Sequence, residues 1–168
     1  MEKFSLTSDF KGVTIIGCKI HESFIQAFFS VMPQLGFDDI KKEGISLKDD
    51  NLISTGVIMT VGIVGEVKGN VVYCLGLEDA KKIASTMMMG MPVEEFDEMA
   101  QSAVSELANM LTANAATFFS EIGITVDIST PTLLYGTNVS IKMSSNQVLC
   151  VKLSANGIPF EANIAING

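Results

Sequence analysis

The chain has 168 residues and a mass of 18.0 kDa, enough for one domain with a sizeable core and too little for two ordinary domains. Hydrophobic residues make up 48% and charged residues only 18% of it, which excludes an intrinsically disordered chain and a coiled coil. The formal net charge of -8 argues against a nucleic-acid backbone or an anionic membrane as partner. A protein or a small molecule fits better as a partner.

Cysteine usage and the lack of export signals predict a cytoplasmic protein. The three cysteines, Cys18, Cys74 and Cys150, are an odd number spread far apart, which is typical of a reducing compartment. The most apolar segment, residues 57–64, is interrupted by polar and small residues and is too short to span a bilayer. Residues 1–11 are charged and lack the apolar core of a secretory signal.

The first part of the chain is predicted to hold a helix and a β-hairpin. Residues 13–16 favour a short strand, and residues 21–35 then place apolar side chains at helical spacing before Gly36, which is suited to end the helix. Residues 41–51 are charged and are predicted to form a loop. Residues 53–75 contain two β-branched runs around a glycine-rich turn, a pattern that indicates a hairpin.

Two helices are predicted in the middle of the chain. Residues 80–88 carry an apolar stripe that ends before Gly90, as expected for a short amphipathic helix. The acidic residues between 94 and 98 should open a long helix, because carboxylates are favoured at a helix N-terminus. That helix is expected to run to about residue 122 and to stop at Gly123.

The remainder of the chain is predicted to be β-structure. Four runs typical of strands are separated by Gly, Asn, Ser and Pro: residues 124–135, 138–144, 147–154 and 160–166. A helix followed by a hairpin thus occurs twice, with the second hairpin expected over residues 138–153. The last run has no counterpart in the first half, so we expect it at a sheet edge, where it could pair with a second copy of the chain.

These elements predict an α+β fold with one mostly antiparallel sheet, long helices packed on it, and a pseudo-twofold helix–hairpin repeat. We expect residues 1–168 to form a single domain. Within it, residues 1–17 would be an N-terminal extension or first strand. Residues 18–90 would be the first half and residues 91–168 the second half, which carries the long helix.

The long helix has two contrasting faces. Its apolar face should lie on the sheet and consists of Val104, Leu107, Ala108, Leu111, Ala115, Phe118 and Ile122. At about 100° per residue, a single outward row contains Ser102, Glu106, Asn109 and Ala113.

The outward face of this helix is unusual because it carries so little charge. Glu106 is the only charged residue between Glu98 and Glu121, and the other positions expected to face outward are Ser105, Thr112, Ala116 and Thr117. Small uncharged side chains let another backbone approach closely, so this face is interpreted as a docking surface with one carboxylate and one carboxamide. The alternative is a helix buried on both faces inside a larger core, which explains the alanines but not an isolated glutamate.

The spacing Ser102-x-x-x-Glu106-x-x-Asn109 resembles the signature of the CheC, CheX and FliY family of chemotaxis phosphatases. The resemblance extends to residues 62–73, 87–91 and 127–136 and is greatest to the CheX members. It implies an enzyme that hydrolyses the aspartyl phosphate of a phosphorylated CheY-like response regulator. The resemblance assigns water positioning to Asn109 and docking to Glu106, which would pair with a lysine of the regulator. Mg²⁺ would be supplied by the regulator, so no cofactor of the chain's own is expected.

The first half lacks the motif: aligning the two apolar stripes places Gln26 opposite Glu106 and Phe29 opposite Asn109. One site per chain resembles the CheX arrangement, which implies a homodimer joined through sheet edges. Ser102 and Ala113 are expected to contact the partner, and Ala113 stands where family members often have glycine.

Other features of the sequence allow further functional interpretations. The chain could instead be a non-catalytic module that binds a receiver domain or resembles a flagellar-switch protein; the expected mark would be loss of Glu106 or Asn109, which is not seen. Cys18 and His21 have the spacing C-x-x-H, but no further histidine or nearby cysteine completes a zinc site, so no metal site is predicted. The ten methionines could fill the core or form an adaptable binding surface.

Overall fold

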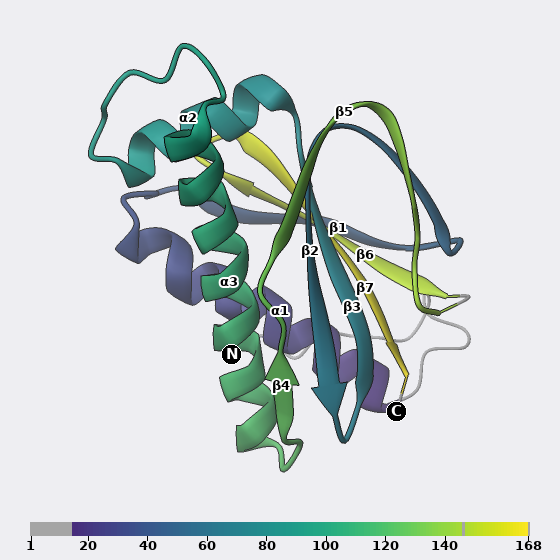
Figure 1. The fold of residues 1–168 in the computed structure, drawn as a ribbon. Helices are drawn as coiled ribbons and strands as arrows, with labels where there is room; N and C mark the ends of the chain where they lie inside the picture. The colour runs from purple at the N-terminus through teal and green to yellow at the C-terminus, as the bar shows by residue number, and fades with distance from the viewer. Residues whose placement is uncertain (1–14, 146, 168) are drawn as a thin grey trace.

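The structure is a computed structural model that describes residues 15–145 and 147–167, in which three helices pack against a seven-stranded sheet (Figure 1). In chain order the elements are α1 (Ile15–Gln34), β1 (Ile40–Lys48), β2 (Asn51–Gly65), β3 (Lys68–Leu75), α2 (Leu77–Met87), α3 (Glu98–Glu121), β4 (Val126–Ile128), β5 (Thr132–Lys142), β6 (Val148–Ala155) and β7 (Ile158–Asn167).

The sheet is antiparallel throughout and has a pseudo-twofold order. The strands lie in the order β1-β6-β7-β3-β2, and β4 and β5 both pair with the outer edge of β2. If β1, β2 and β3 are treated as equivalent to β5, β6 and β7, the strand order counted from one edge of the sheet equals the order counted from the other edge. The predicted α+β class, antiparallel sheet and internal repeat are therefore confirmed.

The hairpins of the two halves are β2–β3 and β6–β7, which corrects the expected second hairpin. β6 pairs with β1 and β7, whereas β5 pairs with β2, so residues 138–153 do not form a hairpin. β7 lies between β6 and β3 in the middle of the sheet, so the expectation of a terminal edge strand was also wrong. Alternation along a strand indicates which side chains share a face, but it does not identify the neighbouring strand.

Two further expectations about strands were wrong. Residues 41–51 do not form a loop, because β1 occupies most of this segment and pairs with β6. Its lysines and its glutamate are typical of an edge strand, where charge prevents unwanted pairing. In the second half, β5 continues through Gly136 and Asn138 as one strand. It accommodates one extra residue as a bulge opposite Ser54–Gly56 of β2, where Asn138 takes φ +52°.

The helix ends agree with the glycine signals in the sequence. Gly36 follows α1 with φ +102°, and Gly123 follows α3 with φ +84°, a conformation that suits glycine. Residues 15 and 16 belong to α1 and not to a strand, so that prediction was wrong for them, while residues 13 and 14 lie outside the described residues. α1 thus begins before the segment that its apolar spacing indicated.

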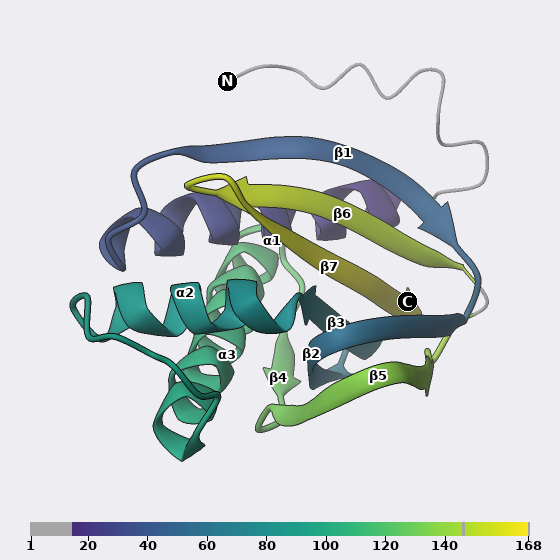
Figure 2. The ribbon, with the colours of Figure 1, turned by 90° about the horizontal axis from the view of Figure 1, so that it is seen from above.

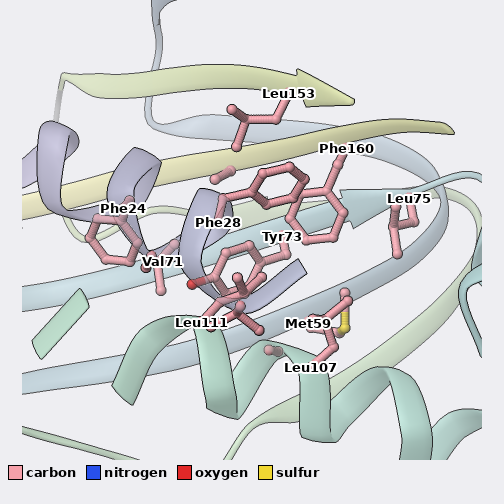
Figure 3. Packing of buried hydrophobic residues seen from close by; sticks show 14 of the residues in the cluster. Phe24, Phe28, Met59, Val71, Tyr73, Leu75, Leu107, Leu111, Leu153 and Phe160 are labelled. Carbon is pink, nitrogen blue, oxygen red and sulfur yellow. The ribbon is translucent and has the colours of Figure 1, made fainter. Parts of the chain in front are cut away.

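The main core lies between the helices and one face of the curved sheet (Figure 2). Phe24 and Phe28 of α1, Tyr73 and Phe160 of the sheet, and Leu111 of α3 meet in this layer (Figure 3). A smaller cluster covers part of the opposite face of the sheet and contains Leu52, Ile58, Val72, Cys74, Met143, Val148 and Ala165. The helices are therefore confined to one face, and α3 presents its other side away from the core.

Candidate functional site

α3 is fixed at its beginning by its N-cap. Asp97 accepts a hydrogen bond from the backbone N–H of Ala100 at 2.9 Å, which satisfies one of the free donors of the first turn. The side chain of Gln101 donates to the carbonyl oxygen of Phe96 at 2.8 Å. The ring of Phe96 also packs edge-on against Tyr135 of β5, with ring centroids 5.6 Å apart. The start of the helix is thus tied to both the preceding loop and the sheet.

One side of α3 is buried against α1, α2 and the sheet, and its residues are Ala100, Val104, Leu107, Ala108, Leu111, Thr112, Ala115 and Phe119. The sequence predicted most of this face, with two differences. Phe119 takes the core position expected for Phe118 and packs edge-on against Phe24, with ring centroids 5.8 Å apart. Ile122 is 42% exposed because it lies beyond the last helical residue.

Thr112 was expected on the outward face, and it is buried. Its Oγ1 donates to the carbonyl oxygen of Ala108 and lies 2.8 Å from the hydroxyl of Tyr73 in β3. The hydroxyl of Thr112 thus has hydrogen-bond partners on the inner face of the helix. Hydrophobic periodicity alone does not predict a polar residue at such a position. Burial holds the pKa of Tyr73 above its usual range.

The predicted outward row is present on the opposite side of α3. Ser102, Glu106 and Ala113 are exposed, and Asn109 is partly buried one turn after Glu106. This exposure contradicts the alternative of a helix buried on both faces. The row therefore lies where a second molecule can reach it.

The side chains of Glu106 and Asn109 are not held by other residues of the described protein. Within the described residues, no hydrogen bond or ion pair engages either side chain, and no other charged residue lies on α3 between Glu98 and Glu121. A carboxylate can pair with a cation, and a carboxamide can both donate and accept hydrogen bonds. Together they can bind a cationic group and hold a water molecule on an approaching partner.

The corresponding helix of the first half does not repeat this pair. Gln26 and Phe29 are both exposed on α1, and Phe29 has 41% of its surface accessible. The exposed positions thus correspond in the two helices, but their chemistry differs. A phenylalanine ring cannot orient water as a carboxamide does, so α3 alone carries the candidate site.

The structure assembles one polar cluster that the sequence analysis did not single out. On the face of the sheet away from the helices, Glu161 lies 2.6 Å from Lys48 Nζ and accepts a hydrogen bond from the thiol of Cys150 at 2.9 Å. Burial opposes ionisation of Glu161, but the hydrogen bond from Cys150 and the charge of Lys48 hold its pKa below the usual range. Burial in turn raises the pKa of Cys150 to about 12. Cys150 and Glu161 lie on the two strands of the β6–β7 hairpin, whereas Lys48 lies 113 residues before Glu161 and reaches it only because β1 pairs with β6.

No metal site emerges from the described residues. Cys18 and His21 both lie in α1, and His21 is buried. In residues 15–145 and 147–167, no three side chains of the His, Cys, Asp or Glu type converge as metal ligands. None of the described helices combines the length and the apolar character needed to cross a bilayer.

The family model described as "Chemotaxis phosphatase CheX" matches residues 57–154, more than half of the chain. The chain belongs to the CheX family. The matched segment includes all of α3 and most of the sheet, and so contains both Glu106 and Asn109.

A curated relative is the CheY-P phosphatase CheX of Thermotoga maritima, 37% identical over 90 residues. The match covers 54% of this chain and 58% of that protein, so the chain spans little more than half the length of this relative.

Solved structures of related chemotaxis proteins share the fold. A CheC-like superfamily protein from Shewanella sp. PV-4 matches with a TM-score of 0.79 and 26% identity, covering 89% of this chain and 98% of the other. The CheX chain in a CheX–CheY–BeF3–Mg²⁺ complex from Borrelia burgdorferi matches with a TM-score of 0.76 and 28% identity, again over 89% of this chain and 98% of the other.

Proposed function

We propose that this chain is a phosphatase that accelerates hydrolysis of the aspartyl phosphate of a CheY-like response regulator. The observation that carries the proposal is the isolated pair Glu106 and Asn109, one turn apart on the accessible face of α3 and free of partners among the described residues. Membership of the CheX family and the solved complex of a relative with CheY support it.

In the proposed reaction, Asn109 enters the active site of the receiver domain and orients a water molecule. Its carboxamide oxygen accepts a hydrogen bond from the water, whose oxygen attacks phosphorus in line with the bond to the aspartyl oxygen. That phosphorus–oxygen bond breaks, the aspartate carboxylate leaves with the bonding electrons, and the water proton passes to the released phosphate or to solvent. A neutral amide suits this role because it does not repel the phosphoryl oxygens.

In this proposal, Glu106 helps to bind the receiver domain. Its carboxylate is exposed and carries the only charge on its part of the helix, so it can pair with a lysine of the receiver. Ser102 and Ala113 lie in the same row and would contact the receiver backbone closely, since both side chains are small. The methyl group of Ala113 sets how closely the two backbones can approach.

Mg²⁺ is proposed to come with the receiver and not with this chain. The relative from Borrelia burgdorferi was solved together with CheY, BeF3 and Mg²⁺, which supports this view. Mg²⁺ would neutralise charge on the phosphoryl oxygens, while the residues of this chain position water and hold the two proteins in register.

A homodimer joined through sheet edges is also proposed. β1 and β5 pair with one strand each, so both keep a free edge in the described part of the chain. β1 carries several charges, whereas β5 has exposed Leu134 and Tyr135 and a single lysine, so β5 is the better candidate. Light scattering should then give twice the mass of 18.0 kDa, and a monomeric mass would contradict the dimer.

Location in the cytoplasm completes the proposal. Cys74 and Cys150 are free thiols, as expected in a reducing compartment. A receiver domain that carries an aspartyl phosphate would meet the chain there.

The proposed function is tested by following the decay of a phosphorylated CheY-type receiver in the presence of Mg²⁺. Catalytic amounts of this chain should accelerate the release of phosphate, with turnover of many receiver molecules per chain. The alternative, a non-catalytic receiver-binding or flagellar-switch-like module, predicts decay that is unchanged or slowed in proportion to the bound fraction. Unaccelerated decay with a receiver that demonstrably binds would therefore overturn the phosphatase proposal.

A further inference from the structure

The loop between α2 and α3 and the first turn of α3 expose three methionines. Met89 is 98%, Met91 53% and Met99 59% exposed, whereas Met87 and Met88 pack against the core. The loop projects beyond the helices in both views of the fold (Figures 1 and 2). The three exposed methionines, unlike Met87 and Met88, do not belong to the core cluster. We call Met89, Met91 and Met99 the methionine surface.

The backbone at Met89 is arranged so that its side chain is presented to solvent. Met89 follows the last turn of α2 with φ +60°, a left-handed conformation that closes the helix and normally favours glycine. The N–H of Gly90 bonds to the carbonyl oxygen of Ser85 at 2.8 Å and completes this turn. A glycine would close the helix with less strain, so this turn does not need the exposed side chain of Met89.

The methionine surface is continuous with the site on α3. At about 100° per residue, Met99 lies within about 20° of Glu106 around the helix axis, two turns before it. Met99 also lines a hollow of about 330 Å³ together with Met88, Met91 and Pro92. A molecule that covers Glu106 and extends toward the beginning of α3 therefore meets Met99 first and then the loop.

Charge around this surface limits what can bind to it. Residues 88–99 contain four carboxylates, on Glu94, Glu95, Asp97 and Glu98, and no lysine, arginine or histidine. A second copy of the same surface, an anionic membrane or a nucleic acid would each bring negative charge toward it. An apolar protein surface rimmed by cations is the complementary partner, and methionine adapts well to such contacts.

We propose that the methionine surface and its acidic rim are a second contact site for the same receiver domain that receives Asn109. This inference rests on the proposed function, because continuity with the row on α3 identifies the occupant. The methionine surface contributes affinity and orientation of the receiver, while hydrolysis depends on Asn109. Changes at this surface should therefore weaken binding and leave turnover at saturation unchanged.

The test measures binding to a CheY-type receiver treated with BeF3 and Mg²⁺, using the receiver that the parent chain binds most tightly in a panel. The double variant Met91→Ser with Met99→Ser should raise the dissociation constant about 10-fold. Val64→Ser is the matched control, since Val64 is 55% exposed on β2 and outside this surface. It should change the dissociation constant less than about 2-fold.

Met89→Gly separates docking from folding. The substitution removes the exposed side chain and relieves the left-handed backbone, so the melting temperature should equal or exceed that of the parent. The dissociation constant should nevertheless rise. A weaker complex with undiminished thermal stability cannot be explained by misfolding.

A charge reversal tests the acidic rim. Glu95→Lys should slow association with the receiver and weaken its salt dependence, whereas Asp49→Lys, at an exposed position in the β1–β2 turn, should do neither. This control makes the same change in net charge at a different place.

The outcomes separate this inference from the proposed function. If the methionine variants bind as tightly as Val64→Ser does while the parent accelerates phosphate release, the second contact site is wrong and the phosphatase stands. If the variants bind more weakly but the parent does not accelerate release, the contact site stands and the phosphatase is wrong. A parent chain that binds no receiver in the panel overturns both.

Discussion

The hydroxyl of Tyr73 lies 2.8 Å from Thr112 Oγ1 and joins the middle of the sheet to the helix that carries Glu106 and Asn109. Thr112 gives its own proton to the carbonyl oxygen of Ala108, so Tyr73 is the donor in this pair. Both residues are almost completely buried. Tyr73 lies among the core side chains between the sheet and α3 (Figure 3). The bond holds the buried side of α3, opposite to the row that contains Glu106 and Asn109.

Removal of this hydrogen bond should destabilise the fold by an amount that depends on which partner is changed. Tyr73→Phe should lower the free energy of unfolding by about 1 kcal/mol, because Thr112 keeps its bond to Ala108. Thr112→Val should cost more, about 1–3 kcal/mol, because the buried Tyr73 hydroxyl then lacks an acceptor. Urea denaturation measures both values, with Tyr135→Phe, on an exposed ring, as the control that should change little. Equal costs for the two core variants would contradict the assigned donor.

The N-cap of α3 gives a second prediction. Asp97→Ala should destabilise the protein by about 1 kcal/mol, because the backbone N–H of Ala100 loses its acceptor. Asp97→Asn keeps a side-chain oxygen in place and should cost much less. Chemical denaturation compares the two variants, and an equal loss in both would show that charge, and not the hydrogen bond, stabilises this end of the helix.

The cluster around Glu161 predicts a dependence of stability on pH. The folded protein holds the pKa of Glu161 below its usual range, so this carboxylate stabilises the fold above the unfolded pKa. That contribution is lost as the pH falls from about 5 through the folded pKa. Glu161→Gln should therefore show a smaller loss of stability on acidification than the parent. Parallel curves of unfolding free energy against pH would contradict the ionised state assigned to Glu161.

Glu106 should affect binding more than folding. Because its side chain is exposed, Glu106→Gln should change the free energy of unfolding by less than about 0.5 kcal/mol. Glu106→Lys should weaken receiver binding more strongly than Glu106→Gln, since it repels the proposed lysine as well as losing the attraction. Glu121→Lys is the control on the same helix. Unchanged affinity in both Glu106 variants would rule out the proposed ion pair.

Local patterns in the sequence were sufficient to predict α3 and its outward row. Helical spacing identified the face that holds Ser102, Glu106, Asn109 and Ala113, because the apolar face of a helix determines which residues lie on the opposite, exposed face. The same spacing misplaced Thr112, since its burial depends on a hydrogen bond to Tyr73, 39 residues away in the chain. Hydrophobic periodicity contains no information about such a partner.

Strand order could not be predicted in the same way. The alternation in β7 was recognised, but its position between β6 and β3 depends on pairing across the two halves. β1 was missed because its charges resemble those of a loop, although they are also what protects an edge strand. The Lys48–Glu161–Cys150 cluster follows from that strand order, so it could not be recognised before the order was known.

The most direct test of the account is the rate of phosphate release from a saturating, phosphorylated CheY-type receiver with Mg²⁺, compared between the parent chain and Asn109→Ala. If Asn109 orients the attacking water, the variant should bind the receiver nearly as tightly as the parent, and kcat should fall by at least about 100-fold. A variant that retains the parent's kcat at saturation would contradict the central role of Asn109.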